Sequence, residues 1–183
     1  PSHPYAKLGE NKFKILTQQT KEFLKNAGIA TQGDYEKNHY RVTPMGTLKS
    51  TWLTLENLLI SENEKCLPIR HPGIFNVTGF LDFYTQFIAD EFLKLGTKCS
   101  IHAVNFPALE NLRKNPTEMR SVNIARIFDK QENIQELVQI LKAESEDCDS
   151  IILPAITGLN REDVVDYLRK EVDKPIYLLP TLP

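Results

Sequence analysis

From Gly73 onward, short apolar segments alternate with segments of helical periodicity. Strands alternating with helices of this length predict right-handed crossovers and a parallel sheet. The strands are nearly continuous in apolar residues, which is typical of a sheet covered on both faces. We therefore expect an α/β fold, a three-layer domain with a mostly parallel sheet flanked by helices. The predicted strands cover 74–79, 100–106, 150–156 and 176–180.

Between these strands the periodicity predicts helices at 80–95 and 117–128, with a helical turn at 107–115. A further helix is expected to start at Asp129, because Glu132 follows three positions later as in a capping box. Asn160 is expected to cap a last helix, which Pro175 ends. The apolar stripes of these two helices are Ile134, Leu137, Val138 and Leu141, and then Val164, Val165 and Leu168.

The first 73 residues have a different pattern. A helix is predicted at 11–27, with Gly28 as its C-terminal cap. Two strands, 39–43 and 48–55, read as a hairpin, and 56–73 reads as loop. We therefore predict a helix and β-hairpin subregion at 1–73 and a parallel-sheet subdomain at 74–183. The two are expected to form one compact unit that is a piece of something larger.

Charge and cysteine content exclude several functions. The net charge of −2 gives no electrostatic case for nucleic acid. No apolar run approaches the ~20 residues that span a bilayer. Three cysteines without CxxC spacing argue against a disulfide framework, a zinc site or an iron–sulfur site, and favour a reducing cytoplasm. No glycine-rich phosphate loop is present.

The segment RVTPMGTLKSTWL, residues 41–53, combines two cations with several hydroxyls around a Pro/Gly turn. Pro44 and Gly46 suit the second and fourth positions of a type I turn. Arginine offers a planar fork for phosphate or carboxylate, and lysine a point charge. In a two-residue hairpin Arg41 and Lys49 would point to opposite faces, so a bulge is needed to bring them together. A solvated hairpin is the alternative. The candidate anion-binding residues are Arg41, Thr43, Thr47, Lys49 and Thr51, with Ser50 as a further hydroxyl.

Arg120 is a second candidate for binding an anion. On a helix covering 117–128 it lies close in angle to Ile124 and Ile127, and a guanidinium on an apolar face needs a carboxylate, carbonyls or a ligand anion. Snorkelling to solvent or an internal ion pair is the alternative. Among the histidines, His39 alone adjoins the hairpin and could act in acid–base chemistry. No metal spacing and no Ser/His/Asp grouping is apparent in the sequence.

The carboxyl ends of the predicted parallel strands are the expected place for a ligand. They are rich in small and polar residues, which also make ordinary turns. They comprise 78–79, 105–106, 155–158 and Thr181.

Residues 41–53 resemble the B-subunit family of anaerobic glycerol-3-phosphate dehydrogenase. Other family-like motifs occur in the family's order along the chain: HPYAKLG at 3–9, GFLDF at 79–83, NPTEMRSVNIARIFD at 115–129 and LLPTLP at 178–183. Each motif is modest alone, but together they cover nearly the whole chain.

This resemblance implies the middle region of a longer flavoprotein, without its flanking flavin-binding segments. FMN or FAD would be bound in the full-length protein and none in this fragment, which would be inactive alone. The family oxidises sn-glycerol 3-phosphate to dihydroxyacetone phosphate and passes electrons to quinone. Its partners are a second flavoprotein, the A subunit, together with a membrane-bound iron–sulfur protein, the C subunit. The expected location is therefore cytoplasmic, at the inner face of the inner membrane. The family supplies no catalytic residue for these positions.

Two alternatives to this function stay open. The chain could be a docking module that binds the flavoprotein partner and touches no substrate. It could also be a free-standing nucleotide-binding α/β domain, although the missing glycine-rich loop argues against that.

Overall fold

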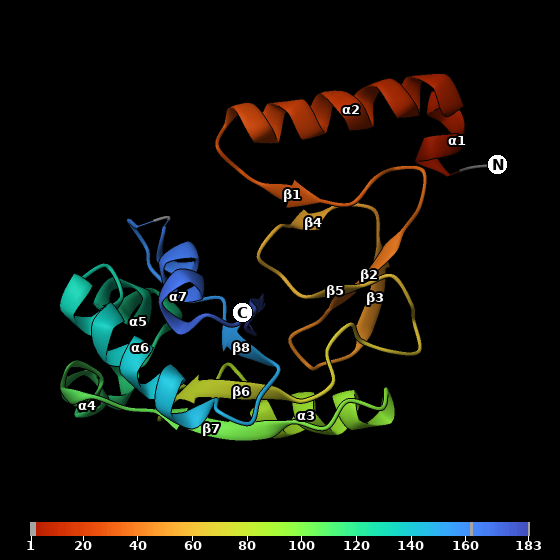
Figure 1. Ribbon diagram of the computed structural model, residues 1–183. Helices are drawn as coiled ribbons and strands as arrows, with labels where there is room; N and C mark the ends of the chain where they lie inside the picture. Colours follow the sequence, from red (N-terminus) through yellow and green to blue (C-terminus); the bar gives the residue numbers. More distant parts are fainter. Residues whose placement is uncertain (1–2, 162, 183) are drawn as a thin grey trace.

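In the computed structural model, which describes residues 3–161 and 163–182, a parallel sheet is flanked by helices on both faces (Figure 1). The sheet order is β7-β6-β8-β9, with all three pairings parallel. The predicted α/β class is therefore confirmed. The strands are β6 (Pro72–Val77), β7 (Ser100–Val104), β8 (Ser150–Pro154) and β9 (Ile176–Leu179).

The connections reverse direction within this sheet. The chain passes from β6 to its neighbour β7 on one side, and then across β6 to β8 and on to β9. Because such crossovers are right-handed, α3 covers one face, and α6 and α7 cover the other. The helices of this part are α3 (Thr85–Lys94), α4 (Pro107–Arg113), the 3₁₀ helix η1 (Pro116–Glu118), α5 (Ser121–Ile127), α6 (Gln131–Glu144) and α7 (Val164–Val172).

The N-terminal part holds two small antiparallel sheets below a long helix that lies far from the parallel sheet (Figure 1). One sheet pairs β1 with β4, and the other has the order β3-β2-β5. The elements are α1 (Pro4–Leu8), α2 (Glu10–Asn26), β1 (Thr31–Gln32), β2 (His39–Val42), β3 (Leu48–Thr51), β4 (Thr54–Leu55) and β5 (Ile60–Ser61).

Residues 57–59 join the two parts by running beside the edge of β9. Leu58 and Leu178 form a parallel bridge, the Leu178 amide donates to the Asn57 carbonyl at 2.8 Å, and the Leu59 amide donates to the Leu178 carbonyl at 3.2 Å. From α7, the Arg169 guanidinium donates to Asn57 Oδ1 at 2.7 Å. The free edge of β9 is thereby covered, as sheet edges generally must be.

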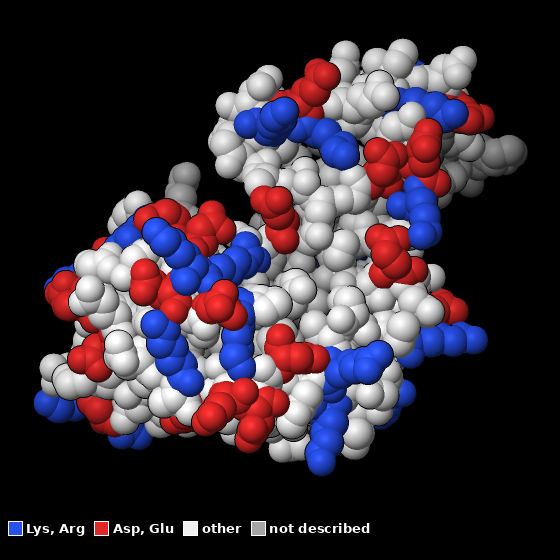
Figure 2. Space-filling view, in the orientation of Figure 1, with Lys and Arg blue, Asp and Glu red and all other residues white. Residues whose placement is uncertain are grey.

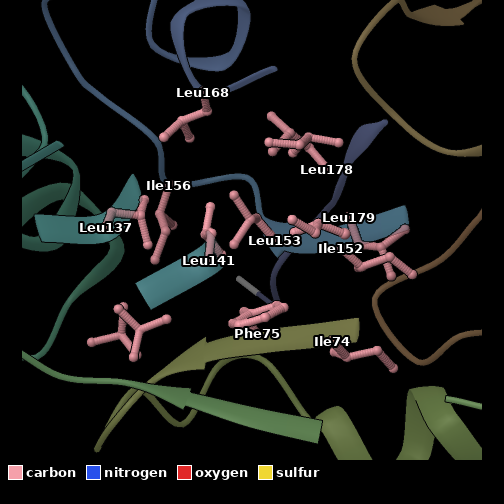
Figure 3. Packing of buried hydrophobic residues seen from close by; sticks show 14 of the residues in the cluster. Ile74, Phe75, Leu137, Leu141, Ile152, Leu153, Ile156, Leu168, Leu178 and Leu179 are labelled. Atoms are coloured by element: carbon pink, nitrogen blue, oxygen red, sulfur yellow. The ribbon is translucent and has the colours of Figure 1, made fainter. Parts of the chain in front are cut away.

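One hydrophobic core serves both parts of the molecule. Phe75 from the sheet lies beneath Leu141 of α6 and Leu168 of α7, and Ile152 of β8 belongs to the same cluster (Figure 3). Val42 and Leu59, from the N-terminal part, belong to the same cluster. Each such side chain contributes about 1.5–3 kcal/mol when fully buried, so this cluster dominates the stability of the fold.

Residues 80–84 are a loop, and the prediction of a helix starting at 80 is wrong. The Asn76 amide donates to the carbonyls of Phe80 and Phe83, at 3.0 and 3.1 Å, and holds the chain in a turn. Phe80 and Phe83 are consequently buried without a helix, which begins only at Thr85. The aromatic residues with helical spacing therefore belong to two different structures, the loop at 80–84 and the helix α3.

Other elements and boundaries also differ from the predictions. The segment predicted as loop at 56–73 contains β5, and β6 already begins at Pro72. The predicted helix at 117–128 is interrupted at Met119, whose ψ of 58° is not helical. The last two helices start at Gln131 and Val164, because Asp129 instead accepts hydrogen bonds from the amide and side chain of Asn160.

Candidate functional site

The β2–β3 hairpin has a three-residue loop closed by a bulge. The Gly46 amide donates to the Thr43 carbonyl at 2.9 Å, and the Thr43 amide donates to the Thr47 carbonyl at 2.8 Å. Gly46 has φ +85°, the left-handed conformation of a type I turn followed by a glycine bulge. The extra residue sets the register so that Arg41 lies directly opposite Lys49. The bulge that is needed to bring Arg41 and Lys49 to the same face is therefore present.

This register places the five candidate residues of the hairpin on one face. Directly opposed residues, and residues two apart along a strand, point to the same side of a sheet. Thr43 Oγ1 and Thr47 Oγ1 are 2.7 Å apart, and Thr51 Oγ1 donates to the Leu53 carbonyl at 3.1 Å. We call Arg41, Thr43, Thr47, Lys49 and Thr51 the cationic face. Ser50 points to the other side, where it accepts a hydrogen bond from Asn38.

The two cations of the cationic face have no partner in the described part of the chain. Arg41 is half-buried and Lys49 is exposed, and within residues 3–161 and 163–182 neither forms an ion pair or side-chain hydrogen bond. Two facing like charges on a sheet repel each other. An anion between them would remove this repulsion and fill the guanidinium's donors. The cationic face therefore has the chemistry of a site for phosphate or carboxylate.

Arg120 does not join the cationic face. It lies at the start of α5, on the opposite side of the molecule from the hairpin (Figure 1). Its side chain is exposed, and Nε donates to the Thr117 carbonyl at 3.3 Å. The premise that Arg120 sits on an apolar helix face is wrong, because the helix breaks at Met119 and restarts at Ser121.

His39 is a buried structural residue. Only 2% of it is exposed, its Nε2 lies 2.7 Å from Thr54 Oγ1, and its ring packs against the backbone of Gly33. Burial lowers the pKa of His39, although the nearby Glu62 carboxylate opposes this shift. A neutral, enclosed imidazole joins β2 to β4 and is poorly placed for proton transfer to a ligand.

We expect His39 to make the chain less stable in mild acid. Its pKa is lower in the folded chain than in the unfolded one, so its contribution is complete above the unfolded value of about 6.5 and is lost as the pH falls through the folded value. Urea unfolding at pH 7.5 and 5.5 should show a larger loss of unfolding free energy for the native chain than for His39→Gln. The difference cannot exceed about 1.4 kcal/mol per pH unit. Equal losses would contradict this assignment.

The crevice at the carboxyl ends of β6 and β8 is filled by the chain itself. The connections reverse between β6 and β8, where open α/β sheets usually bind ligands. Here the side chain of Arg113 lies against Gly79, 3.2 Å from where a Cβ would stand. Asp129 holds the following loop through the amides of Leu159 and Asn160, and the void behind Val77 measures about 10 Å³. This crevice does not fit a dinucleotide such as FAD, so we assign no flavin contact there.

A hydrogen-bonded series on β7 was not anticipated. His102 Nε2 lies 2.8 Å from Ser100 Oγ, and His102 Nδ1 lies 3.1 Å from Glu144 Oε2. Ser100 Oγ also contacts the buried Sγ of Cys148 at 3.3 Å, and the imidazole stacks on Phe75. The series ties the end of α6 to the sheet. Glu144 is distant in the sequence, so no local pattern could reveal it.

The described residues give little support to a thiol nucleophile, a metal site or a membrane-spanning helix. Burial raises the pKa of the Cys99 thiol to about 12, so that thiol is a poor nucleophile. No group of three or more His, Cys, Asp or Glu in the described ranges could hold a metal ion. Among the described helices, none combines the length and apolarity needed to cross a membrane. Basic and acidic side chains are interspersed on the face in Figure 2.

The comparisons with known proteins cover the whole chain. The family model described as FAD binding domain matches residues 2–183. The B subunit of anaerobic glycerol-3-phosphate dehydrogenase from Yersinia enterocolitica is 39% identical over 184 residues, which cover 100% of this chain and 43% of the relative. The proteins of the same name from Pectobacterium carotovorum and Haemophilus ducreyi are 36% and 35% identical over 100% of this chain, and 44% and 43% of their own lengths. The chain thus spans less than half the length of these curated relatives.

Proposed function

Since the chain belongs to the FAD binding domain family, we propose that it is the middle, cap region of a flavin-dependent dehydrogenase that acts on sn-glycerol 3-phosphate. The relatives named as B subunits of anaerobic glycerol-3-phosphate dehydrogenase align with it from end to end, which is the observation that carries the proposal. In this proposal the substrate is oxidised to dihydroxyacetone phosphate, and the electrons leave through partner proteins towards quinone.

The chain's own residues would contribute phosphate recognition to this reaction. Arg41 and Lys49, which have no side-chain partner among the described residues, face each other beside the hydroxyls of Thr43 and Thr47. A phosphate monoester carries close to two negative charges and three acceptor oxygens at neutral pH, which match a guanidinium fork, an ammonium and two hydroxyls. Arg120, on the far side of the molecule, would not share in this contact. The flavin would belong to parts of the longer protein outside these residues.

Assembly with other proteins completes the proposal. The relatives' name designates one subunit of several, so it implies further polypeptides. We infer that these are a second flavoprotein, the A subunit, together with a membrane-bound iron–sulfur protein, the C subunit. This chain would then be cytoplasmic and peripheral at the inner membrane. The alternative role, docking a partner without substrate contact, would leave the cationic face unused.

We expect dehydrogenase activity only in the assembled protein. A complex that contains the full-length polypeptide should reduce an artificial electron acceptor when sn-glycerol 3-phosphate is added. Residues 1–183 alone should give no reduction above a substrate-free control, because redox chemistry belongs to the cofactor. Glycerol without phosphate serves as the matched control substrate for the complex. Failure of the complex to oxidise sn-glycerol 3-phosphate would refute the proposed substrate.

A further inference from the structure

An uncharged groove of about 500 Å³ lies between β7, the loop 78–84 and the start of α3. Its lining contains no Asp, Glu, Lys or Arg, in a chain whose charged content is 25%. Four large apolar side chains at the groove are open to solvent: Leu81 (75% exposed), Phe87 (53%), Ile101 (44%) and Tyr84 (42%). Contiguous apolar surface that lacks charge is typical of the centre of a protein interface.

The parallel sheet also ends at this groove in a strand whose outer edge is unpaired among the described residues. β7 is an edge strand, and no strand of the described residues pairs with its outer side. Its residues alternate, so Ile101 and Ala103 face away from His102, which packs against Phe75 and α6. Both Ile101 and Ala103 are exposed although they lie on the face that α3 covers. An apolar, uncovered edge strand is a surface on which proteins add a further strand or layer.

The groove is rigid enough to receive such an element. The Asn76 amide fixes the loop through two hydrogen bonds to the carbonyls of Phe80 and Phe83. Tyr84 and Phe87 stack edge to face, with ring centroids 5.7 Å apart. Preorganised aromatic side chains lose little conformational freedom when they are covered.

The described C-terminal segment runs to the same loop. The Leu182 amide donates to the Asp82 carbonyl at 2.9 Å, next to the groove residue Leu81. The curated relatives extend well beyond the matched region, since these residues cover 43–44% of their length. Sequence after residue 183 would start beside the groove at a high effective concentration.

We propose that this groove and the outer edge of β7 are covered by the part of the same full-length polypeptide that lies outside residues 1–183. The inference rests on the proposal that the chain is the middle region of a longer flavoprotein. A tethered segment needs no complementary charge to find its site, which agrees with the uncharged lining. The edge strand would then become an interior strand of a larger sheet or layer.

Photo-crosslinking in the full-length protein tests this proposal. Phe87→p-benzoyl-phenylalanine places a photoreactive group in the groove, and the same change at Leu93 is the matched control, because Leu93 is exposed on the same helix and does not line the groove. After irradiation, mass spectrometry identifies the crosslinked peptide. We expect position 87 to crosslink within one polypeptide to a peptide from outside residues 1–183. A crosslink to a partner protein, to a second copy or within residues 1–183, or none at all, would overturn the proposal.

A stability measurement gives an independent readout. Phe87→Asp should lower the melting temperature of the full-length protein by roughly 3 °C or more, and Leu93→Asp by roughly 1 °C or less, because only the first places a charge in a covered apolar site. Equal shifts would count against the proposal. Neither readout uses activity towards sn-glycerol 3-phosphate, so docking and the assigned reaction can fail separately.

Discussion

Gly46→Ala should lower the free energy of unfolding by about 2–4 kcal/mol. Two effects add at this position. The left-handed φ of +85° costs about 1–2 kcal/mol for a residue with a side chain. A Cβ would also stand 2.8 Å from the Cα of Ile88 and 3.1 Å from the Cβ of Glu91, both in α3. Backbone cannot yield as a flexible side chain can, so the hairpin must move away from α3. Urea unfolding of the purified chain measures the change.

Gly96→Ala is the matched control for this prediction. Gly96 has a similar φ of +80°, but nothing lies within 4 Å of the position that its Cβ would take. The control should therefore show the conformational cost alone, about 1–2 kcal/mol. Equal losses in the two variants would mean that the turn of the hairpin does not pack on α3.

Arg41→Met should raise the KM for sn-glycerol 3-phosphate about 10–100-fold in the assembled dehydrogenase, with a smaller effect on kcat. A hydrogen bond to a charged group contributes about 1.5–3 kcal/mol, and each 1.4 kcal/mol is a factor of ten. Lys49→Met should raise KM by about tenfold, since a point charge supplies less directional bonding. Arg41→Lys should fall between the native protein and Arg41→Met, because it keeps the charge and loses the fork.

Binding to the chain itself gives a second measurement of the same site. Saturating sn-glycerol 3-phosphate should raise the melting temperature of residues 1–183, because a ligand at 100 times its Kd adds about 2.7 kcal/mol of stability. Arg41→Met should reduce that rise, and the exposed Lys25→Met on α2 should leave it unchanged. An unaltered KM in both Arg41→Met and Lys49→Met would remove the cationic face from substrate recognition.

The parallel sheet could be predicted because each of its strands has a recognisable local residue pattern. Ile151, Ile152 and Leu153 form a continuous apolar run, which is typical of a sheet buried on both faces. The turn at Pro44 was also predictable from residue chemistry. The register was not, because Gly46 can close a two-residue or a three-residue loop, and the residue types fit both.

The errors arose where hydrogen bonds and backbone angles that the residue pattern does not show decide the local structure. Phe80 and Phe83 have helical spacing, but the Asn76 amide holds them in a loop. Arg120 was expected on an apolar helix face, but the chain leaves helical geometry at Met119. The two-residue strand β5 is too short to give any periodic signal, and its pairing with β2 exists only in the folded chain. Site residues that depend on register or on helix boundaries therefore needed the structure.

The contact of Leu58 with Leu178 affects the order in which the molecule can be built. A ribosome makes the first of these residues long before the second, and such a contact of high sequence separation is slow to close. Residues 57–59 can therefore form their final contacts only after β9 has been made. Newly made chains that stop before Leu178 should therefore lack the contacts between residues 57–59 and β9. This segment should then be accessible to chaperones and proteases.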